Sequence, residues 1–166
     1  MALLEWSDAL SLDLPLMDDT HHEFVELLAL VEAAPDATLR QAWQDLIDHT
    51  DGHFGQEDAW MQATRFASGN CHSMQHKVVL QVMREGAAMG ARGELAPIRQ
   101  MARELAVWFP QHAQAMDAAL ALHLRRAGFD PVTGQVHAPE ALPTELIHGC
   151  GGHCHESEPQ AEAASA

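Results

Sequence analysis

Residues 36–60 read DATLRQAWQDLIDHTDGHFGQEDAW. Its large apolar residues recur every three or four positions, which places them on one face of an α-helix. The residues with this spacing are Leu39, Trp43, Leu46, Thr50, His53, Glu57 and Trp60. Since His53 and Glu57 belong to the set, two polar side chains fall where burial is expected.

Three more segments carry a helical period: residues 18–34, residues 70–87 and residues 94–126. Pro35 ends the first, while Gly90 and Gly93 interrupt the third, and no alternating strand pattern lies between the segments. Four helices joined by short connections predict an all-α fold, an antiparallel up-down four-helix bundle.

The bundle is expected to occupy residues 1–128, where residues 1–17 form an N-terminal arm that covers one end. Proline, glycine and small polar residues break the period after Gly128. Residues 129–166 are therefore expected to form a largely irregular C-terminal tail, ordered in part if Leu142 and its apolar neighbours pack on the bundle.

The composition limits the classes of function. The chain has 166 residues, 9 Lys+Arg, 24 Asp+Glu and a formal charge of -15, which makes nucleic acid and anionic membranes poor partners. No apolar run is long enough to span a membrane. The N-terminus MALLEWSD lacks the features of a signal peptide, and three cysteines make no disulfide framework, so we expect a cytoplasmic protein. The 12 histidines stand out.

Polar side chains lie on the inward face of every predicted helix. Residues four apart project from the same face about one turn apart, so both can reach one ion. The seven inward residues are His21, His53, Glu57, His72, His76, His112 and Asp117. Left unpaired, each would cost a few kcal/mol, more in sum than the roughly 5–15 kcal/mol that stabilises a domain. Five imidazoles and two carboxylates are more ligands than one four-coordinate zinc ion can bind. They suit two metal ions that share the carboxylates as bridging ligands.

Other interpretations of these residues remain open. The histidines could be satisfied core residues without a metal, and the same four-residue spacing occurs by chance in His22 and Glu26. His22 could replace His21 as the inward residue, although His21 shares its face with Leu28. His112 and Asp117 are five apart and should diverge around a helix, so the carboxylate of Asp117 suits a bridge to a second ion.

The segments MDDTHHEF, HFGQED, HSMQH and WFPQHAQAMD, in this order over roughly residues 5–125, resemble the hemerythrin family and its bacteriohemerythrin branch. The resemblance implies two iron ions joined by an oxo or hydroxo bridge. It implies one iron held by His72, His76 and His112. It implies that His21 and His53 hold the other iron, which keeps a position open for dioxygen. Glu57 and Asp117 would bridge both.

The implied function is reversible dioxygen binding for storage, delivery or sensing. The alternative is an enzyme with the same ligands, a di-iron peroxidase, oxidase or nitric-oxide reductase, or else iron handling assisted by the tail. Dioxygen is the expected ligand, and an oxygen-using enzyme or a metal-exchange protein is the expected partner.

Four features stand beside this pattern. Phe109 takes a position where leucine is frequent in the family, either as an ordinary core aromatic or to narrow the oxygen pocket. Gly52 and Gly55 flank His53 and indicate close helix approach, a pocket wall or simple tolerance. Cys71 is expected to be a small buried residue. The tail carries a possible second metal site, which could equally be an idle flexible segment: His148, Cys150, His153, Cys154 and His155.

Overall fold

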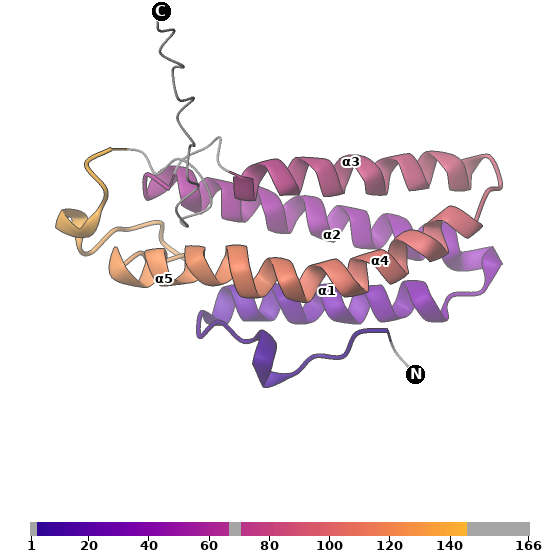
Figure 1. The fold of residues 1–166 in the computed structure, drawn as a ribbon, viewed down its shortest axis with the longest axis horizontal. Coiled ribbons are helices and arrows are strands. Elements are labelled where there is room, and N and C mark those ends of the chain that lie inside the picture. The colour runs from indigo at the N-terminus through magenta and orange to yellow at the C-terminus, as the bar shows by residue number, and fades with distance from the viewer. Residues whose placement is uncertain (1–2, 67–70, 146–166) are drawn as a thin grey trace, which may run out of the picture.

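The structure is a computed structural model that describes residues 3–66 and 71–145. Its main elements are the helices α1 (Pro15–Ala33), α2 (Asp36–Ala63), α3 (Cys71–Ala91), α4 (Ala96–His112) and α5 (Ala118–Arg126). α1 packs against α2 and α4, and α3 packs against the same two helices. α5 continues the line of α4 and completes the fourth rod of an antiparallel bundle (Figure 1). The predicted all-α four-helix bundle is confirmed.

Two helix boundaries differ from the sequence prediction. α1 begins three residues earlier than expected, at Pro15, because proline fixes the backbone angle that the first helical position needs. Gly90 does not interrupt α3, which continues to Ala91. A Cβ atom at Gly90 would lie 2.7 Å from Cδ1 of Ile98, so this glycine permits a close approach of α3 and α4. Gly93, with φ of +89°, forms the turn between them.

The fourth rod is not a continuous α-helix. Between α4 and α5 lies η2 (Ala113–Asp117), one turn of π-helix. The turn follows Pro110, which lies inside α4 and lacks the N–H that the helix would use. Single π-turns of this kind widen a helix locally and are frequent at functional sites.

The apolar core is divided into two clusters by polar residues. Along α2, Trp43 and Leu46 belong to the first cluster, whereas Trp60 and Met61 belong to the second. Between them α2 buries three polar residues, Thr50, His53 and Glu57, beside the aromatic ring of Phe54. The other long helices also carry buried polar residues at this level. The bundle thus contains a polar layer enclosed by apolar packing at both ends.

The N-terminal arm runs beside α1 instead of covering one end of the bundle (Figure 1). It contains the short 3-10 helix η1 (Asp8–Leu10). Leu10 packs into the first core cluster and Leu14 into the second, so the arm spans the polar layer. The expectation that the arm covers one end of the bundle was wrong. The arm runs along the bundle instead, because its apolar residues pack against both core clusters.

The described part of the tail, residues 129–145, folds back on the bundle. Phe129 and Val136 form an isolated antiparallel bridge, and Leu142 packs against the second core cluster after the 3-10 helix η3 (Pro139–Ala141). No helix in residues 3–66 and 71–145 combines the length and apolar character that a membrane crossing needs.

Candidate metal centre

The polar layer contains all seven residues that the sequence singled out. α1 supplies His21, α2 supplies His53 and Glu57, α3 supplies two histidines, and the fourth rod supplies His112 and Asp117. Each of the seven is only 0–4% exposed. The structure therefore brings four distant segments to one sealed point inside the bundle.

The two carboxylates divide the histidines into two sets. Glu57 turns Oε1 toward Nε2 of His53, at 3.0 Å, and of His21, at 3.8 Å. Its Oε2 lies 3.3 Å from Nε2 of His72 and 3.4 Å from Nε2 of His76. One carboxylate therefore serves both sets, one oxygen to each.

Asp117 repeats this division from the opposite rod. Its Oδ1 lies 2.9 Å from Nε2 of His72 and 3.2 Å from Nε2 of His112. Its Oδ2 lies 3.2 Å from Nε2 of His21. Metal-ligand geometry accordingly defines two overlapping groups, Glu57 with His72, His76, His112 and Asp117, and Glu57 with His21 and His53.

Most of the atoms that face this point have no hydrogen-bond partner within the protein. They include Nε2 of His21, His72, His76 and His112, together with Oε2 of Glu57 and both carboxylate oxygens of Asp117. Buried polar atoms left unpaired are costly, and so many at one point are not explained by protein packing. Coordination of metal ions by imidazole and carboxylate atoms would satisfy them, so the donor set fits a metal centre.

The charges of the cluster are strongly coupled. Burial opposes ionisation of Glu57, but the surrounding histidines, His53 foremost, hold its pKa well below the ordinary value. Burial likewise disfavours a charged imidazole at His21 and His72, yet the carboxylates of Asp117 and then Glu57 raise both pKa values to about 9. Without metal, the cluster would hold protons where a cation binds, so metal binding must displace them.

Two polar side chains outside the cluster orient its histidines. Oδ1 of Asp58 lies 3.1 Å from Nδ1 of His76, and Oε1 of Gln75 lies 3.0 Å from Nδ1 of His112. Such contacts fix the ring so that Nε2 points at the metal position. Sequence reasoning missed both residues. Each adjoins a predicted ligand in the sequence, Glu57 or His76, but adjacency does not show which way the side chain turns.

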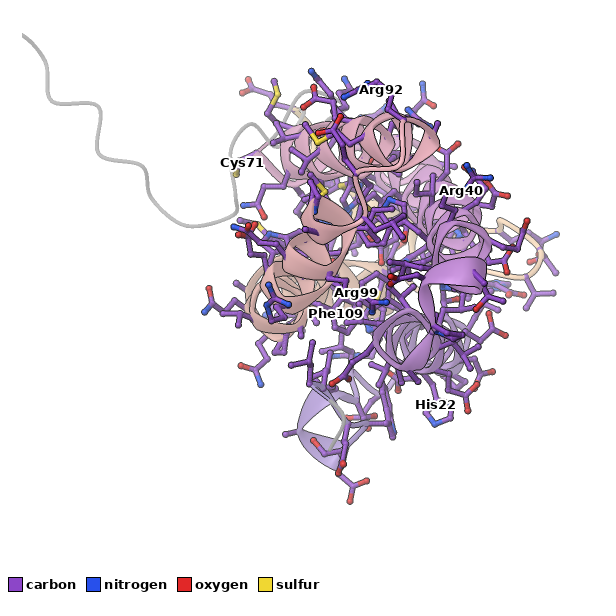
Figure 2. The ribbon with its side chains drawn as sticks, turned by 90° about the vertical axis from the view of Figure 1, so that its right-hand side faces the viewer. His22, Arg40, Cys71, Arg92, Arg99 and Phe109 are labelled. Carbon is purple, nitrogen blue, oxygen red and sulfur yellow. The ribbon has the colours of Figure 1, made fainter. Side chains whose placement is uncertain are left out.

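Aromatic rings hold the same histidines from the side. Phe54 stacks on His76 with ring centroids 3.9 Å apart, and Trp108 stacks on His112 at 4.4 Å. Phe109 lies inside the bundle, stacked on Phe24 and perpendicular to the ring of His21, with the Phe109 and His21 ring centroids 5.2 Å apart (Figure 2). Phe109 is therefore adjacent to the set with fewer ligands.

The remaining histidines with described surroundings lie outside the cluster. His22 is exposed and lies on the outer side of α1 (Figure 2), 3.7 Å from Glu26. His49 contacts the Thr20 carbonyl, and His123 contacts the Thr64 carbonyl. His21, not His22, is the residue that faces inward from α1.

The expectation for Cys71 was wrong, and that for the tail is not addressed by the structure. Cys71 is half-buried rather than buried, because it stands at the start of α3, and it is disulfide-bonded. The proposed second metal site, at His148, Cys150, His153, Cys154 and His155, lies outside the described residues.

A four-helix bundle that buries histidines around two shared carboxylates defines the class of metal-binding helical-bundle proteins. The family model described as "Hemerythrin HHE cation binding domain" matches residues 12–123. The chain belongs to the hemerythrin family, in its bacteriohemerythrin branch.

Two relatives illustrate the extent of the similarity. The bacteriohemerythrin of Ralstonia nicotianae is 37% identical over 130 residues, which cover 78% of this chain and 95% of that protein. The bacteriohemerythrin of Stenotrophomonas maltophilia is 27% identical over 127 residues, 73% of this chain and 81% of that one. No solved structure matches the chain significantly.

Proposed function

We propose that this protein binds dioxygen reversibly at a non-haem di-iron centre, for oxygen storage, delivery or sensing. His72, His76 and His112 would hold one iron, and His21 and His53 the other. Glu57 and Asp117 would bridge the two, together with an oxo or hydroxo group. The iron pair would supply the electrons that bind dioxygen, and the open position would lie on the side of His21 and His53.

One observation carries the proposal: each carboxylate directs its two oxygens to different sets of histidines. Oε1 and Oε2 of Glu57 face His53 and His76 respectively, and Oδ1 and Oδ2 of Asp117 face His112 and His21. A single ion would leave one set unused. Two ions with bridging carboxylates would satisfy the unpaired Nε2 and carboxylate oxygen atoms of both sets.

The surroundings of the cluster favour binding over turnover. Five neutral imidazoles and two carboxylates make a less anionic ligand set than a site dominated by carboxylates, and such a set stabilises highly oxidised iron less. The apolar rings of Phe24 and Phe109 lie next to His21 and exclude water from that side of the metal centre.

The expectation of a cytoplasmic location from the sequence is kept as part of this proposal. An enzyme that consumes oxygen is the expected partner in delivery.

The test is an iron count combined with an optical spectrum of anaerobically reduced protein, recorded before and after oxygen is added. We expect two irons per chain and a visible charge-transfer band that fades when oxygen is removed. A site that goes directly to the diferric form without such a band contradicts reversible binding. Steady consumption of peroxide or nitric oxide with a reductant would show the enzyme alternative instead.

A further inference from the structure

The seven cluster residues are sealed from solvent, being 0–4% exposed. A hydrated cation therefore cannot reach them directly from outside. Some part of the bundle surface must let the ion in before the folded chain can take up metal. The structure contains a hollow that meets this need.

A hollow of about 660 Å³ lies between α2 and α3. Its wall includes Phe54, His76 and Leu80, and its rim includes exposed residues such as Gln81 and Glu85, so it opens to solvent. His76 is thus a member of the cluster that also forms part of the wall of a solvent-facing hollow.

Asp58 connects the hollow to the cluster. Its side chain lines the hollow and is 39% exposed, while its Oδ1 lies 3.1 Å from Nδ1 of His76. The carboxylate can therefore attract a cation from solvent while it contacts the ring that binds the metal. Arg84 and Lys77 also line the hollow, but Arg84 is paired with Asp51 at 3.0 Å. Lys77 alone does not cancel the carboxylates of Asp58 and Glu85.

Gly55 keeps the hollow open. A Cβ atom built at this position meets no atom within 4 Å, so the glycine is not there for close helix approach. It lines the hollow, and it also lines a second one of about 270 Å³ that Asp58 and Lys77 share. A larger side chain at position 55 would occupy part of the hollow that Asp58 also lines. Gly52 also has open space around it but does not line either hollow.

We infer that the α2–α3 hollow is the route by which divalent metal ions enter and leave the centre. In this route Gly55 leaves the space through which the ion passes, and the carboxylate of Asp58 attracts the ion to the side of the bundle where His76 lies. The inference rests on the proposed metal centre. Dioxygen would not need this route: a neutral molecule gains nothing from a carboxylate. The hollow also meets His76, in the larger ligand group, whereas the smaller group contains His21 and His53.

The test compares Gly55→Leu with Gly52→Leu. Both changes replace an exposed glycine on α2 and improve helix propensity by a similar amount, about 1 kcal/mol. Metal-free protein is mixed anaerobically with Co²⁺ or Fe²⁺, uptake is followed by absorbance, and release is then followed with a chelator. We expect Gly55→Leu to slow uptake and release by about tenfold or more, because local opening of the bundle becomes the remaining route. Final metal content should equal that of the parent, and Gly52→Leu should keep the parental rates.

Three results would overturn the inference. Equal rates in all three proteins would show that the ion enters elsewhere. Equal slowing in both variants would assign the effect to a stiffer α2. Slower oxygen association in Gly55→Leu with unchanged metal uptake would make the hollow a gas route. Because Co²⁺ uptake is measured without oxygen, failure of this inference is distinguishable from failure of oxygen binding.

Discussion

His112 and Asp117 lie five residues apart and face the same point, with Nε2 of His112 3.2 Å from Oδ1 of Asp117. In an α-helix, residues five apart diverge by more than a quarter turn. Here the intervening backbone is the π-turn η2, whose wider path returns the fifth residue to the same face. The position of the Asp117 carboxylate between the two histidine sets therefore depends on this local distortion.

Replacement of His76 by alanine should remove a ligand from the fuller set. We expect the variant to lose or weaken at least one iron and to lose stable oxygen binding, measured by iron per chain and by the visible spectrum. His123→Ala is the matched control, because His123 contacts the Thr64 carbonyl and lies outside the cluster. Full iron content in His76→Ala would contradict its assignment as a ligand.

Much of the fold and candidate site follows from helical spacing alone. Inward-facing positions such as His53 and Glu57 can be read from a period of three to four residues, because that period fixes which face of a helix is buried. The π-turn could not be read in this way, since the residues of η2 carry no local signal for it and Asp117 was expected to diverge from His112. Asp58 was missed because its contact with His76 depends on how α2 and α3 pack.

Asp58→Asn should weaken metal binding without changing the fold. The contact of its carboxylate with Nδ1 of His76 orients the ring and strengthens it as a donor. Loss of such a contact typically costs about 10–100-fold in metal affinity. Chelator competition would measure it. Asp51→Asn is the control, because it removes the same charge from the same hollow but its partner is Arg84, not a ligand. Equal affinities in the two variants would exclude the orienting role.

The stability of the metal-free protein should fall as pH rises. The pKa values of His21 and His72 are raised to about 9, because the Asp117 and Glu57 carboxylates outweigh the opposing effect of burial. The folded state then holds protons that the unfolded state releases above its ordinary pKa of 6.5. This stabilisation is complete below about pH 6.5 and disappears as pH rises through about 9.

Thermal unfolding of metal-free protein at pH 6, 7.5 and 9 would show this dependence as a decreasing Tm. Burial lowers the pKa values of His49 and His112, so both rings favour the neutral form from about pH 6.5 upward and should not reverse the decline. Iron-loaded protein should not follow the same decline, because the metal replaces those protons, and metal affinity should rise over the same range. A metal-free Tm that is constant or increases with pH would contradict the charge coupling in the cluster.

Phe109→Leu should open the side of the site on which oxygen binding is proposed. The Phe109 ring is fully buried, stacks on Phe24 at 4.4 Å and lies perpendicular to the ring of His21. A leucine leaves space beside His21 that water can approach, so we expect faster autoxidation of the oxygen-bound protein and altered oxygen on- and off-rates. The loss of core packing should cost about 1–2 kcal/mol of stability.

The variant Phe66→Leu separates the effect of Phe109→Leu on stability from its effect on oxygen binding and autoxidation. Phe66 is also buried, but it belongs to the second core cluster and its ring contacts His123, outside the metal cluster. The Phe66→Leu variant should lose about as much stability as Phe109→Leu but keep the parental oxygen kinetics. The kinetics are measured by stopped-flow mixing and by the decay of the visible band. If Phe109→Leu also keeps the parental on-rate, off-rate and autoxidation rate, Phe109 is an ordinary core aromatic and does not shape the oxygen pocket.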